Sequence, residues 1–464
     1  MKVKREWSWI QKRGDEYMFE LPAWLFITLA WICRILVVVV FANLIYYTVL
    51  SVFGLKTPKR EYKMAPDKRR FLFLIPANNE EAVIAETIQG LLSLNYDKKL
   101  YDIVCIADNC TDRTAEIARK YDVEVFENQS ERGAPRGKPH GIAAYLTSEP
   151  LEWHRYDYIA FVDADNYLHP DYLKEVNSQL EANPELTVVQ GYLGTKNVFS
   201  SITSTGYAAV YYITNRAVQY AKALLGWNAS IGGTGFVLAT DYIKEYGWNP
   251  RSYTEDFELQ VELSIQGKQS RWNHWAKTYD EKPNHFSVSH RQRKRWAQGH
   301  WLVGITQTPE QLKSIFQSKS LNEFLNKTET LFYSYSMVRP VAFCIIGILG
   351  IIDFRLWHYF PGLFSLLPFW VALEVFNFLI IPVVYCLQEG AHDFKEQKQW
   401  WKKLLFMVRL IVAFLWNTIT YAIVQVVGFC TWFYPQNKWV KTVHSMTADQ
   451  HIRFNSMEEG IDEE

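Results

Sequence analysis

Phe161-Val162-Asp163-Ala164-Asp165-Asn166 is the stretch from which the expected fold of this chain follows. Residues 158–162 are apolar and rich in β-branched and aromatic side chains, which predicts a buried strand. Two carboxylates follow it with one small residue between them. Ligands of parallel α/β sheets bind at the carboxyl ends of the strands, and paired carboxylates there suit a hard divalent cation. The pattern favours a cation that bridges the protein to a nucleoside diphosphate; a loop of solvated acids is the alternative.

The composition of the 464-residue chain narrows the choice of partners. Basic and acidic residues balance at 49 each, so charge gives no reason to expect nucleic acid as a partner. Aromatic residues make up 16% and cluster in or beside apolar runs, as membrane interfaces favour. The cysteines show no metal-ligand spacing, and we expect them to be reduced. We expect no cleaved signal peptide, because the first apolar run starts late and is too long.

Apolar runs divide the chain into five regions. The first run, at 21–54, can cross a bilayer once with tilt but is too short to cross it twice. The basic residues after it predict that the next domain is cytoplasmic. We expect an N-terminal tail and transmembrane helix at 1–70, an α/β domain at 71–305, amphipathic interfacial helices at 306–331, transmembrane helices at 332–434 with a cytoplasmic linker at 389–403, and a C-terminal tail at 435–464.

Strand-like and helix-like segments alternate in the second region. Strands are expected at 71–75, 103–107, 123–126 and from 158, and helices at 80–92, 111–120, after Gly141 and from Asp171. This alternation predicts an open, mostly parallel sheet of the nucleotide-binding kind.

Two polar clusters follow the first two expected strands, and a basic step lies downstream of them. Pro76-Ala77-Asn78-Asn79-Glu80 and Asp108-Asn109-Cys110-Thr111-Asp112 each precede an expected helix, whose free N–H groups can bind a ligand. Asp108 can accept a hydrogen bond from a base or ribose while Asn109 or Thr111 caps the helix that follows. The alternatives are an ordinary helix start for the first cluster and, for Asp112, an acid that suits the dipole of a first helical turn. Arg136-Gly137-Lys138 can lay an ammonium against phosphate.

Two further clusters suit chemistry on an acceptor. Thr254-Glu255-Asp256 begins an expected helix at 256–266, where Asp256 is either a cap or a general base that removes a hydroxyl proton. A helix N-terminus favours the charged form of such a carboxylate. His290-Arg291-Gln292-Arg293-Lys294-Arg295-Trp296 is either a basic surface patch or a pyrophosphate clamp beside an indole on which a sugar can stack.

Together these motifs resemble those of the membrane-integrated family 2 glycosyltransferases, which include cellulose, chitin, hyaluronan and poly-N-acetylglucosamine synthases. The match consists of Pro76-x-x-Asn79-Glu80, Asp108, Asp163-x-Asp165, Thr254-Glu255-Asp256 and Gln292-x-x-Arg295-Trp296, in this order. It covers about residues 71–301 and the flanking membrane segments. It implies a GT-A type nucleotide-sugar-binding domain with a mostly parallel sheet, flanked by transmembrane and interfacial α-helices.

The resemblance also implies a role for each matched residue. The catalytic residues would be Asp256, as general base, with Glu255 and Thr254. The donor nucleotide would contact Pro76, Ala77, Glu80, Asp108, Lys138, Asp163, Gln292 and Arg295. The acceptor would contact Gly233, Thr234 and Trp296, and Mg²⁺ or Mn²⁺ would bind Asp163 and Asp165. Asp280-Glu281-x-Pro283 also resembles a segment of bacterial members. The family often has Tyr where Asn78 stands, so aromatic contact with the base is in doubt.

The resemblance implies a processive, inverting, metal-dependent polysaccharide synthase. It would transfer a hexose from a UDP-sugar, UDP-glucose before UDP-N-acetylglucosamine, to a growing β-glycan that it extrudes through the membrane. A non-processive membrane glycosyltransferase that adds one sugar to a lipid or carrier lipid is the alternative. A non-enzymatic membrane anchor is disfavoured, because every motif acid is present. The sequence leaves open the donor sugar, the linkage, and whether the protein is a monomer or a homo-oligomer.

We further expect a multi-pass protein of the plasma membrane, whose partners are the UDP-sugar, the growing glycan and the bilayer. Polar residues within the C-terminal apolar runs are costly in lipid, so we expect them to face a water- or glycan-filled path. Pairing between helices is the alternative for these residues, which are Arg339, Glu374, Asn377, Arg409 and Asn417.

Overall fold

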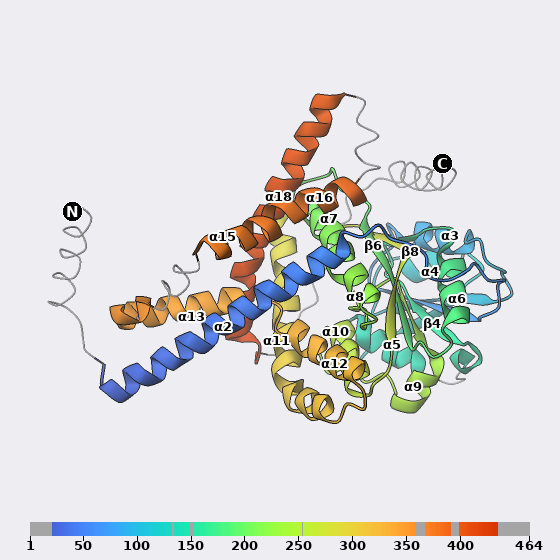
Figure 1. The fold of residues 1–464 in the computed structure, drawn as a ribbon. Helices are drawn as coiled ribbons and strands as arrows, with labels where there is room; N and C mark the ends of the chain where they lie inside the picture. Colours follow the sequence, from blue (N-terminus) through green and yellow to red (C-terminus); the bar gives the residue numbers. More distant parts are fainter. Residues whose placement is uncertain are drawn as a thin grey trace.

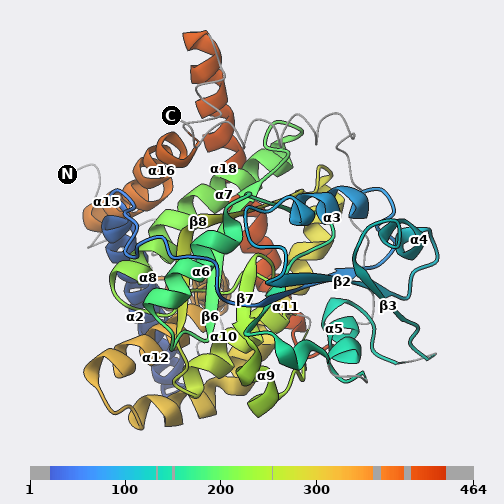
Figure 2. The same cartoon turned by 90° about the vertical axis from the view of Figure 1, so that its right-hand side faces the viewer.

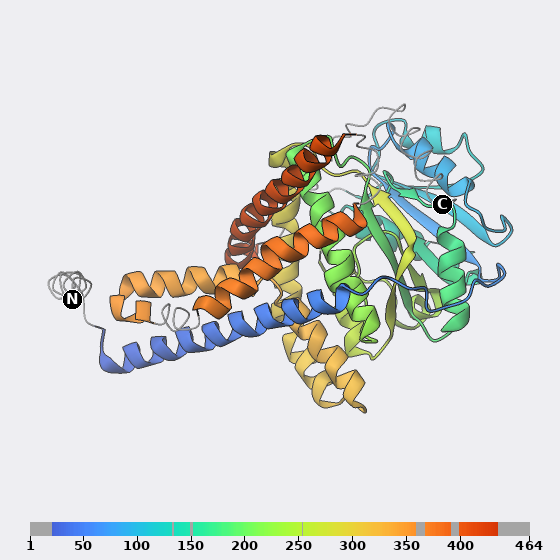
Figure 3. The same ribbon diagram turned by 45° about the horizontal axis from the view of Figure 1, so that its top comes forward.

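The computed structural model describes residues 21–131, 134–148, 152–252, 254–358, 367–390 and 399–434. An α/β domain lies at one end of the molecule, and a group of long helices extends from it (Figures 1 and 3). The expected tails at 1–20 and 435–464 lie outside the described residues, as does most of the expected linker at 389–403.

The α/β domain is built on one eight-stranded sheet of order β3-β2-β1-β4-β7-β6-β8-β5. The strands are β1 (Phe71–Ala77), β2 (Tyr101–Asp108), β3 (Glu124–Asn128), β4 (Tyr158–Phe161), β5 (Tyr167–Leu168), β6 (Val188–Thr195), β7 (Phe236–Ala239) and β8 (Ser270–Asp280). β3, β2, β1 and β4 are parallel to one another, as the sequence predicts. β7 is antiparallel to both of its neighbours, β6 and β8 are parallel, and β5 is antiparallel to β8, so the whole sheet is mixed.

Helices cover both faces of this sheet (Figure 2). One buried core packs the sheet against α3 (Ile84–Leu92) and α6 (Tyr172–Ala182). The other packs it against α5 (Lys138–Leu146), α9 (Thr240–Tyr246) and α10 (Glu255–Ile265). Apolar surface on both faces explains why the strands are continuous apolar runs instead of alternating ones. The domain also contains α4 (Thr114–Ala118), η1 (Glu152–Arg155), α7 (Ile202–Thr214), the π-helical η2 (Asn215–Tyr220) and α8 (Ala221–Leu224).

The reversal of β7 decides which loops meet. Because β7 runs against β4, Phe236 at its start pairs with Phe161 at the end of β4. The N–H of Gly235 donates to the carbonyl of Phe161 at 2.9 Å. The glycine-rich loop before β7, Gly232-Gly233-Thr234-Gly235, therefore lies beside Asp163, whereas a parallel β7 would have carried it to the opposite edge.

Several helices start later or earlier than the sequence predicts. α3 begins at Ile84 instead of residue 80, because Asn79 has a φ of 60° and turns the chain. Its Oδ1 accepts from the N–H groups of Thr111 (2.7 Å) and Asp112 (3.2 Å), which holds the second loop out of helix until α4. The predicted caps Asn109 and Thr111 are therefore wrong. α5 begins at Lys138, ahead of Gly141.

Three helical segments are long and apolar enough to cross a membrane: Ala23–Gly54 (α2), Val371–Glu389 and Trp400–Thr431 (α18). α12 (Leu321–Ser334) and α13 (Val338–Ile352), bent by 54°, make a fourth if they count as one span. The second segment comprises the end of α15 (Leu367–Val375) from Val371, η4 (Phe376–Ile380) and α16 (Ile381–Glu389). η3 (Phe354–His358) follows α13.

α11 (Phe286–Phe316) crosses the boundary expected at residue 305 without a break, despite Pro309 within it. One side of this helix packs on α10 and the other on α18. Helix–helix burial on both sides outweighs the one backbone hydrogen bond that a proline cannot donate. α11 thus extends from the α/β domain to the apolar helices as one continuous helix.

The polar residues within the C-terminal apolar runs pair with residues of other elements. This is the pairing between helices that the sequence left as the alternative to a water- or glycan-filled path. Asn377 donates to Oγ1 of Thr48 at 2.7 Å, and Asn417 accepts from Arg293 at 2.8 Å. The other pairs are Arg339 with Glu374 at 3.7 Å and Arg409 with the carbonyl of Phe199 at 2.9 Å.

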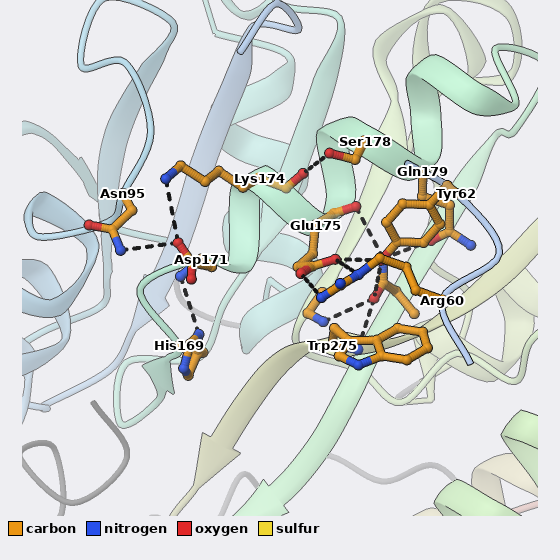
Figure 4. A network of polar contacts seen from close by, with 12 residues as sticks. Arg60, Tyr62, Asn95, His169, Asp171, Lys174, Glu175, Ser178, Gln179 and Trp275 are labelled. Atoms are coloured by element: carbon orange, nitrogen blue, oxygen red, sulfur yellow. Dashed lines mark hydrogen bonds and ion pairs between the residues drawn. The ribbon is translucent and has the colours of Figure 1, made fainter. Parts of the chain in front are cut away.

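The chain that leaves α2 is fastened along α6 and β8 (Figure 4). Arg60 donates to both carboxylate oxygens of Glu175 at 3.1 and 2.6 Å, and Tyr62 donates to Glu175 at 2.7 Å. The guanidinium of Arg60 also lies 5.1 Å from the ring centre of Trp275. A second anchor is Arg216, which donates to the carbonyl of Gly54 at the end of α2 at 2.9 Å.

Candidate active site

The candidate site lies at the edge of the sheet where β1, β2 and β4 end and β7 begins. Asp163 follows β4, and its N–H donates to Oγ1 of Thr234 at 3.1 Å. Asn166 donates to the same oxygen at 3.1 Å. Thr234 is therefore buried beneath the loop of paired acids. The predicted role in acceptor binding, which needs an accessible side chain, is wrong for this residue.

Lys138, at the start of α5, links the loops that meet here. Its Nζ donates to Oδ1 of Asp163 and to the carbonyl of Gly233, both at 2.5 Å. The turn into α5 needs a glycine, because Gly137 has a φ of 111°. Burial opposes the charged form of Lys138, but Asp163 and the acids of α10 outweigh it and raise its pKa. An ammonium is thus held beside the paired acids.

The paired acids have the chemistry of a ligand set for Mg²⁺ or Mn²⁺. The side chain of Asp163 is 40% exposed, and the backbone carbonyl of Asp165 accepts from Nζ of Lys196 at 2.7 Å. In the described part of the chain, no group of three or more His, Cys, Asp and Glu side chains is arranged to hold a metal ion. Carboxylate oxygens fit a cation that takes its other ligands from a diphosphate and water.

The first turn of α10 brings two more carboxylates to the site. Oδ1 of Asp256 accepts from the N–H of Phe257 at 2.8 Å. Oδ2 faces the glycine-rich loop: a Cβ atom on Gly233 would lie 3.0 Å from it. Gly233 also has a φ of +78°, so the loop approaches Asp256 as closely as it does because this residue is a glycine.

Burial sets the protonation of these carboxylates. It raises the pKa of Glu255 to about 7 and also raises that of Asp256, while the cations Lys138 and Arg295 pull both pKa values down. The sequence predicts that the helix terminus favours the charged form of Asp256. Desolvation outweighs that effect, although the N–H of Phe257 acts in the predicted direction.

α11 carries the basic cluster to the other side of this site. Arg295 lies near enough to Glu255 and Asp256 for its charge to lower their pKa values. The predicted pyrophosphate clamp on α11 and the candidate base on α10 are therefore neighbours. Oε1 of Gln292 is buried and accepts no hydrogen bond among the described residues. Trp296 is partly exposed and meets the ring of Tyr207 edge-on at 6.4 Å.

Contacts outside the site hold α11 in place. Nη1 of Arg293 donates to Oδ1 of Asn417 at 2.8 Å and to Oγ1 of Thr420 at 3.1 Å, both on α18. On its other side, a Cβ on Gly299 would lie 2.5 Å from Oγ1 of Thr254. Thr254 is therefore buried at the α10–α11 contact and not exposed beside the other expected catalytic residues.

The predicted nucleotide contacts lie at the ends of β1 and β2. Asp108 is 3% exposed, and its Oδ1 accepts from Asn109 at 2.8 Å and Asn128 at 2.7 Å. Glu80 is partly exposed in the turn before α3, next to Pro76 and Ala77 at the end of β1. Contact of these residues with a uridine stays a prediction.

Sequence reasoning missed two residues that support the site. Lys196 holds the backbone of Asp165, and no motif marks it. Lys282 donates to Asp280 and to Tyr211, and Asp280 lies near enough to Asp163 for their charges to interact. The motif Asp280-Glu281-x-Pro283 was the one feature of the sequence that could have pointed to Lys282 and its partners.

Comparison with known proteins agrees with the geometry. The family model described as "Glycosyltransferase like family 2" matches residues 66–299. Probable glycosyltransferase YdaM of Bacillus subtilis (strain 168) is 27% identical over 241 residues, which cover 50% of this chain and 55% of that protein. Poly-beta-1,6-N-acetyl-D-glucosamine synthase of Staphylococcus aureus (strain COL) is 25% identical over 234 residues, covering 49% of this chain and 53% of that protein. The chain thus matches about half the length of these curated relatives.

A solved structure shares the fold. The mannosyltransferase PcManGT from Pyrobaculum calidifontis, in complex with GDP-Man and Mn²⁺, superposes with a TM-score of 0.51 at 17% identity. The match covers 84% of this chain and 99% of that one. The mixed sheet and its helices are therefore of the GT-A type.

Proposed function

This chain belongs to glycosyltransferase family 2, and on that premise we propose that it is a membrane-integrated hexosyltransferase that uses a UDP-sugar donor. The observation that carries the proposal is the position of Lys138. It bonds Asp163 on the donor side and the carbonyl of Gly233 on the other, and Gly233 abuts Asp256. A donor diphosphate and an acceptor hydroxyl would thus meet within one small, charged region.

The proposed mechanism assigns proton transfer to Asp256 and charge neutralisation to the cations. Asp256 takes the proton of the acceptor hydroxyl as the new bond forms at the anomeric carbon. Arg295 and Lys138 stabilise the charge that builds on the departing diphosphate. Attack opposite the leaving group inverts the anomeric carbon, so an α-linked donor gives a β-linkage. Mg²⁺ or Mn²⁺, held by Asp163 and Asp165, would supply further positive charge to the diphosphate.

We propose that the product is a β-glycan extended by repeated transfer. The name of the staphylococcal relatives supports a polymer and supports testing UDP-N-acetylglucosamine ahead of UDP-glucose. The apolar helix α18 braces α11, which keeps the site next to the membrane-directed helices that extrusion would use. Mn²⁺ in the complex of the mannosyltransferase that shares the fold supports a divalent cation.

We also propose that the α/β domain faces the cytoplasm, where nucleotide sugars are made. The basic flank after α2 supports this side by the positive-inside tendency. Some basic residues of that flank also attach it to the α/β domain. Arg60 pairs with Glu175, and Lys68 pairs with Glu181. The five expected regions keep their boundaries in this proposal, except that α11 joins the second to the third.

A donor and product assay on the purified full chain tests the function. We expect UDP release with one UDP-hexose, Mg²⁺ or Mn²⁺ present, and a ladder or high polymer by mass spectrometry. Asp256→Asn serves as the matched inactive control. A product with one added sugar on a lipid would favour the non-processive alternative. UDP release from no UDP-sugar in the panel would overturn the proposal.

A further inference from the structure

A shallow groove lies where the α/β domain meets the first turns of α18, apart from the active site. It has a volume of about 220 Å³ and is lined by Phe199, Lys402, Leu405, Phe406 and Arg409. α18 packs against α7 along its length, and Phe199 lies in the loop that precedes α7. The rings of Phe199 and Phe406 lie 4.8 Å apart, which closes the bottom of the groove with apolar surface.

Two cations face this groove. Lys402 and Arg409 are seven residues apart on α18, so they share one face of the helix. Neither forms an ion pair with an acid among the described residues. Arg409 uses one donor on the carbonyl of Phe199, at 2.9 Å, and a guanidinium has five. Its remaining donors and the ammonium of Lys402 suit an anion with several acceptor oxygens.

The surface next to the cations is apolar and exposed. Leu405 is 58% exposed, and Leu404, Val408 and Val412 continue the exposed stripe along α18. Trp401 lies against Lys402, with Nζ 5.5 Å from the ring centre, and Trp400 is 76% exposed. Tryptophans beside basic residues are typical of the headgroup level of a bilayer. An acyl chain can pack against such an apolar stripe, whereas a free phosphate cannot.

We propose that this groove binds the anionic headgroup of a membrane phospholipid, with its acyl chains along the exposed stripe of α18. The position gives the lipid a route to the active site. Arg409 holds the carbonyl of Phe199, and the same loop begins with Lys196, whose Nζ holds the backbone of Asp165. The lipid therefore binds one short loop away from the paired acids.

Photo-crosslinking tests this site on the full chain in nanodiscs. A photoactivatable phosphatidylglycerol and a matched phosphatidylcholine are compared at equal mole fraction, and labelling of residues 399–412 is read by mass spectrometry. We expect phosphatidylglycerol to label this segment about fivefold or more above phosphatidylcholine, since one cation near an anionic surface contributes about that factor. The double variant Lys402→Gln/Arg409→Gln should reduce labelling to the phosphatidylcholine level.

Two further variants make the outcome decisive. Lys403→Gln is the matched control: it removes a neighbouring cation that does not line the groove, and selectivity should persist. If the double variant fails to fold, Lys402→Gln/Arg409→Lys keeps the donor to Phe199 and should lose about fivefold. Equal labelling by both lipids, or selectivity unchanged in the variants, overturns the proposal. Loss of labelling on adding inorganic phosphate, with no preference between lipids, shows a phosphate site and also overturns it.

Discussion

The carboxylates beside the two halves of the sheet have different surroundings. In the parallel half, Asp163 stays 40% exposed and bonds the ammonium of Lys138. In the half that begins with the reversed β7, Asp256 lies against Gly233 with Glu255 just before it on α10, and burial raises both of their pKa values. The first half places Asp163 where the proposed cation and diphosphate would bind. The other holds carboxylates for which taking up a proton is easy.

This difference follows from desolvation. Asp163 has the ammonium of Lys138 at 2.5 Å and keeps contact with solvent. Glu255 and Asp256 are also partly exposed, but the protein packed around them desolvates them enough to raise their pKa values even with cations nearby. We therefore expect variants of the paired acids to lose UDP binding together with transfer, and variants of the α10 carboxylates to lose transfer alone.

The largest effect is expected from Asp163→Ala or Asp165→Ala in the parallel half. On the proposed function each would remove a ligand for the cation, so transfer should fall to background and UDP should bind more weakly in Mn²⁺. Activity and UDP affinity are measured on the same preparation. Transfer above about a tenth of wild type, or full activity in chelator, would contradict the metal role.

Asp256→Asn should separate the halves most cleanly. An asparagine oxygen can still accept from the N–H of Phe257, so the helix should lose about 1 kcal/mol or less. It cannot take a proton, so transfer should fall about a hundredfold or more while UDP binding remains. Asp241→Asn, in the first turn of α9, is the control and should leave transfer unchanged. Loss of UDP binding would make Asp256 structural.

Gly233→Ala should lower transfer about tenfold, because the new Cβ would press on Oδ2 of Asp256 at 3.0 Å. The φ of +78° adds a folding cost of about 1–2 kcal/mol. Gly226→Ala is a matched control, because Gly226 has a φ of +70° and no atom within 4 Å of its Cβ position. Both variants should unfold earlier, and transfer should fall in Gly233→Ala alone. An equal fall in both would remove the steric argument.

Glu255→Gln should have the smallest effect on the maximal rate and a visible effect on pH dependence. The folded pKa of Glu255, about 7, lies above its ordinary value of 4.5, so wild-type stability is lost as pH rises through that interval. The variant lacks this loss, which amounts to about 3 kcal/mol between pH 4 and pH 8. Melting curves from pH 4 to 8 measure it, and parallel curves would contradict it.

Local patterns in the sequence determined much of this molecule. The apolar runs of β1, β2 and β4, each followed by polar residues at one edge, predicted the parallel half and the position of Asp108 and Asp163. Long apolar runs predicted α2 and the C-terminal helices. These signals are local, because strand and helix periodicity reflects only neighbours within a few residues.

Tertiary structure alone decided what surrounds those residues. The run Phe236–Ala239 carries no mark of its direction, yet its reversal brings Gly233 to Lys138, 95 residues earlier. The start of α3 depended on Asn79 bonding another loop, and the protonation of Asp256 depended on burial that no motif encodes. Strand direction, loop contact and desolvation are set by how distant segments pack, and that packing is why the sequence predicted the residues of the site but not their environment.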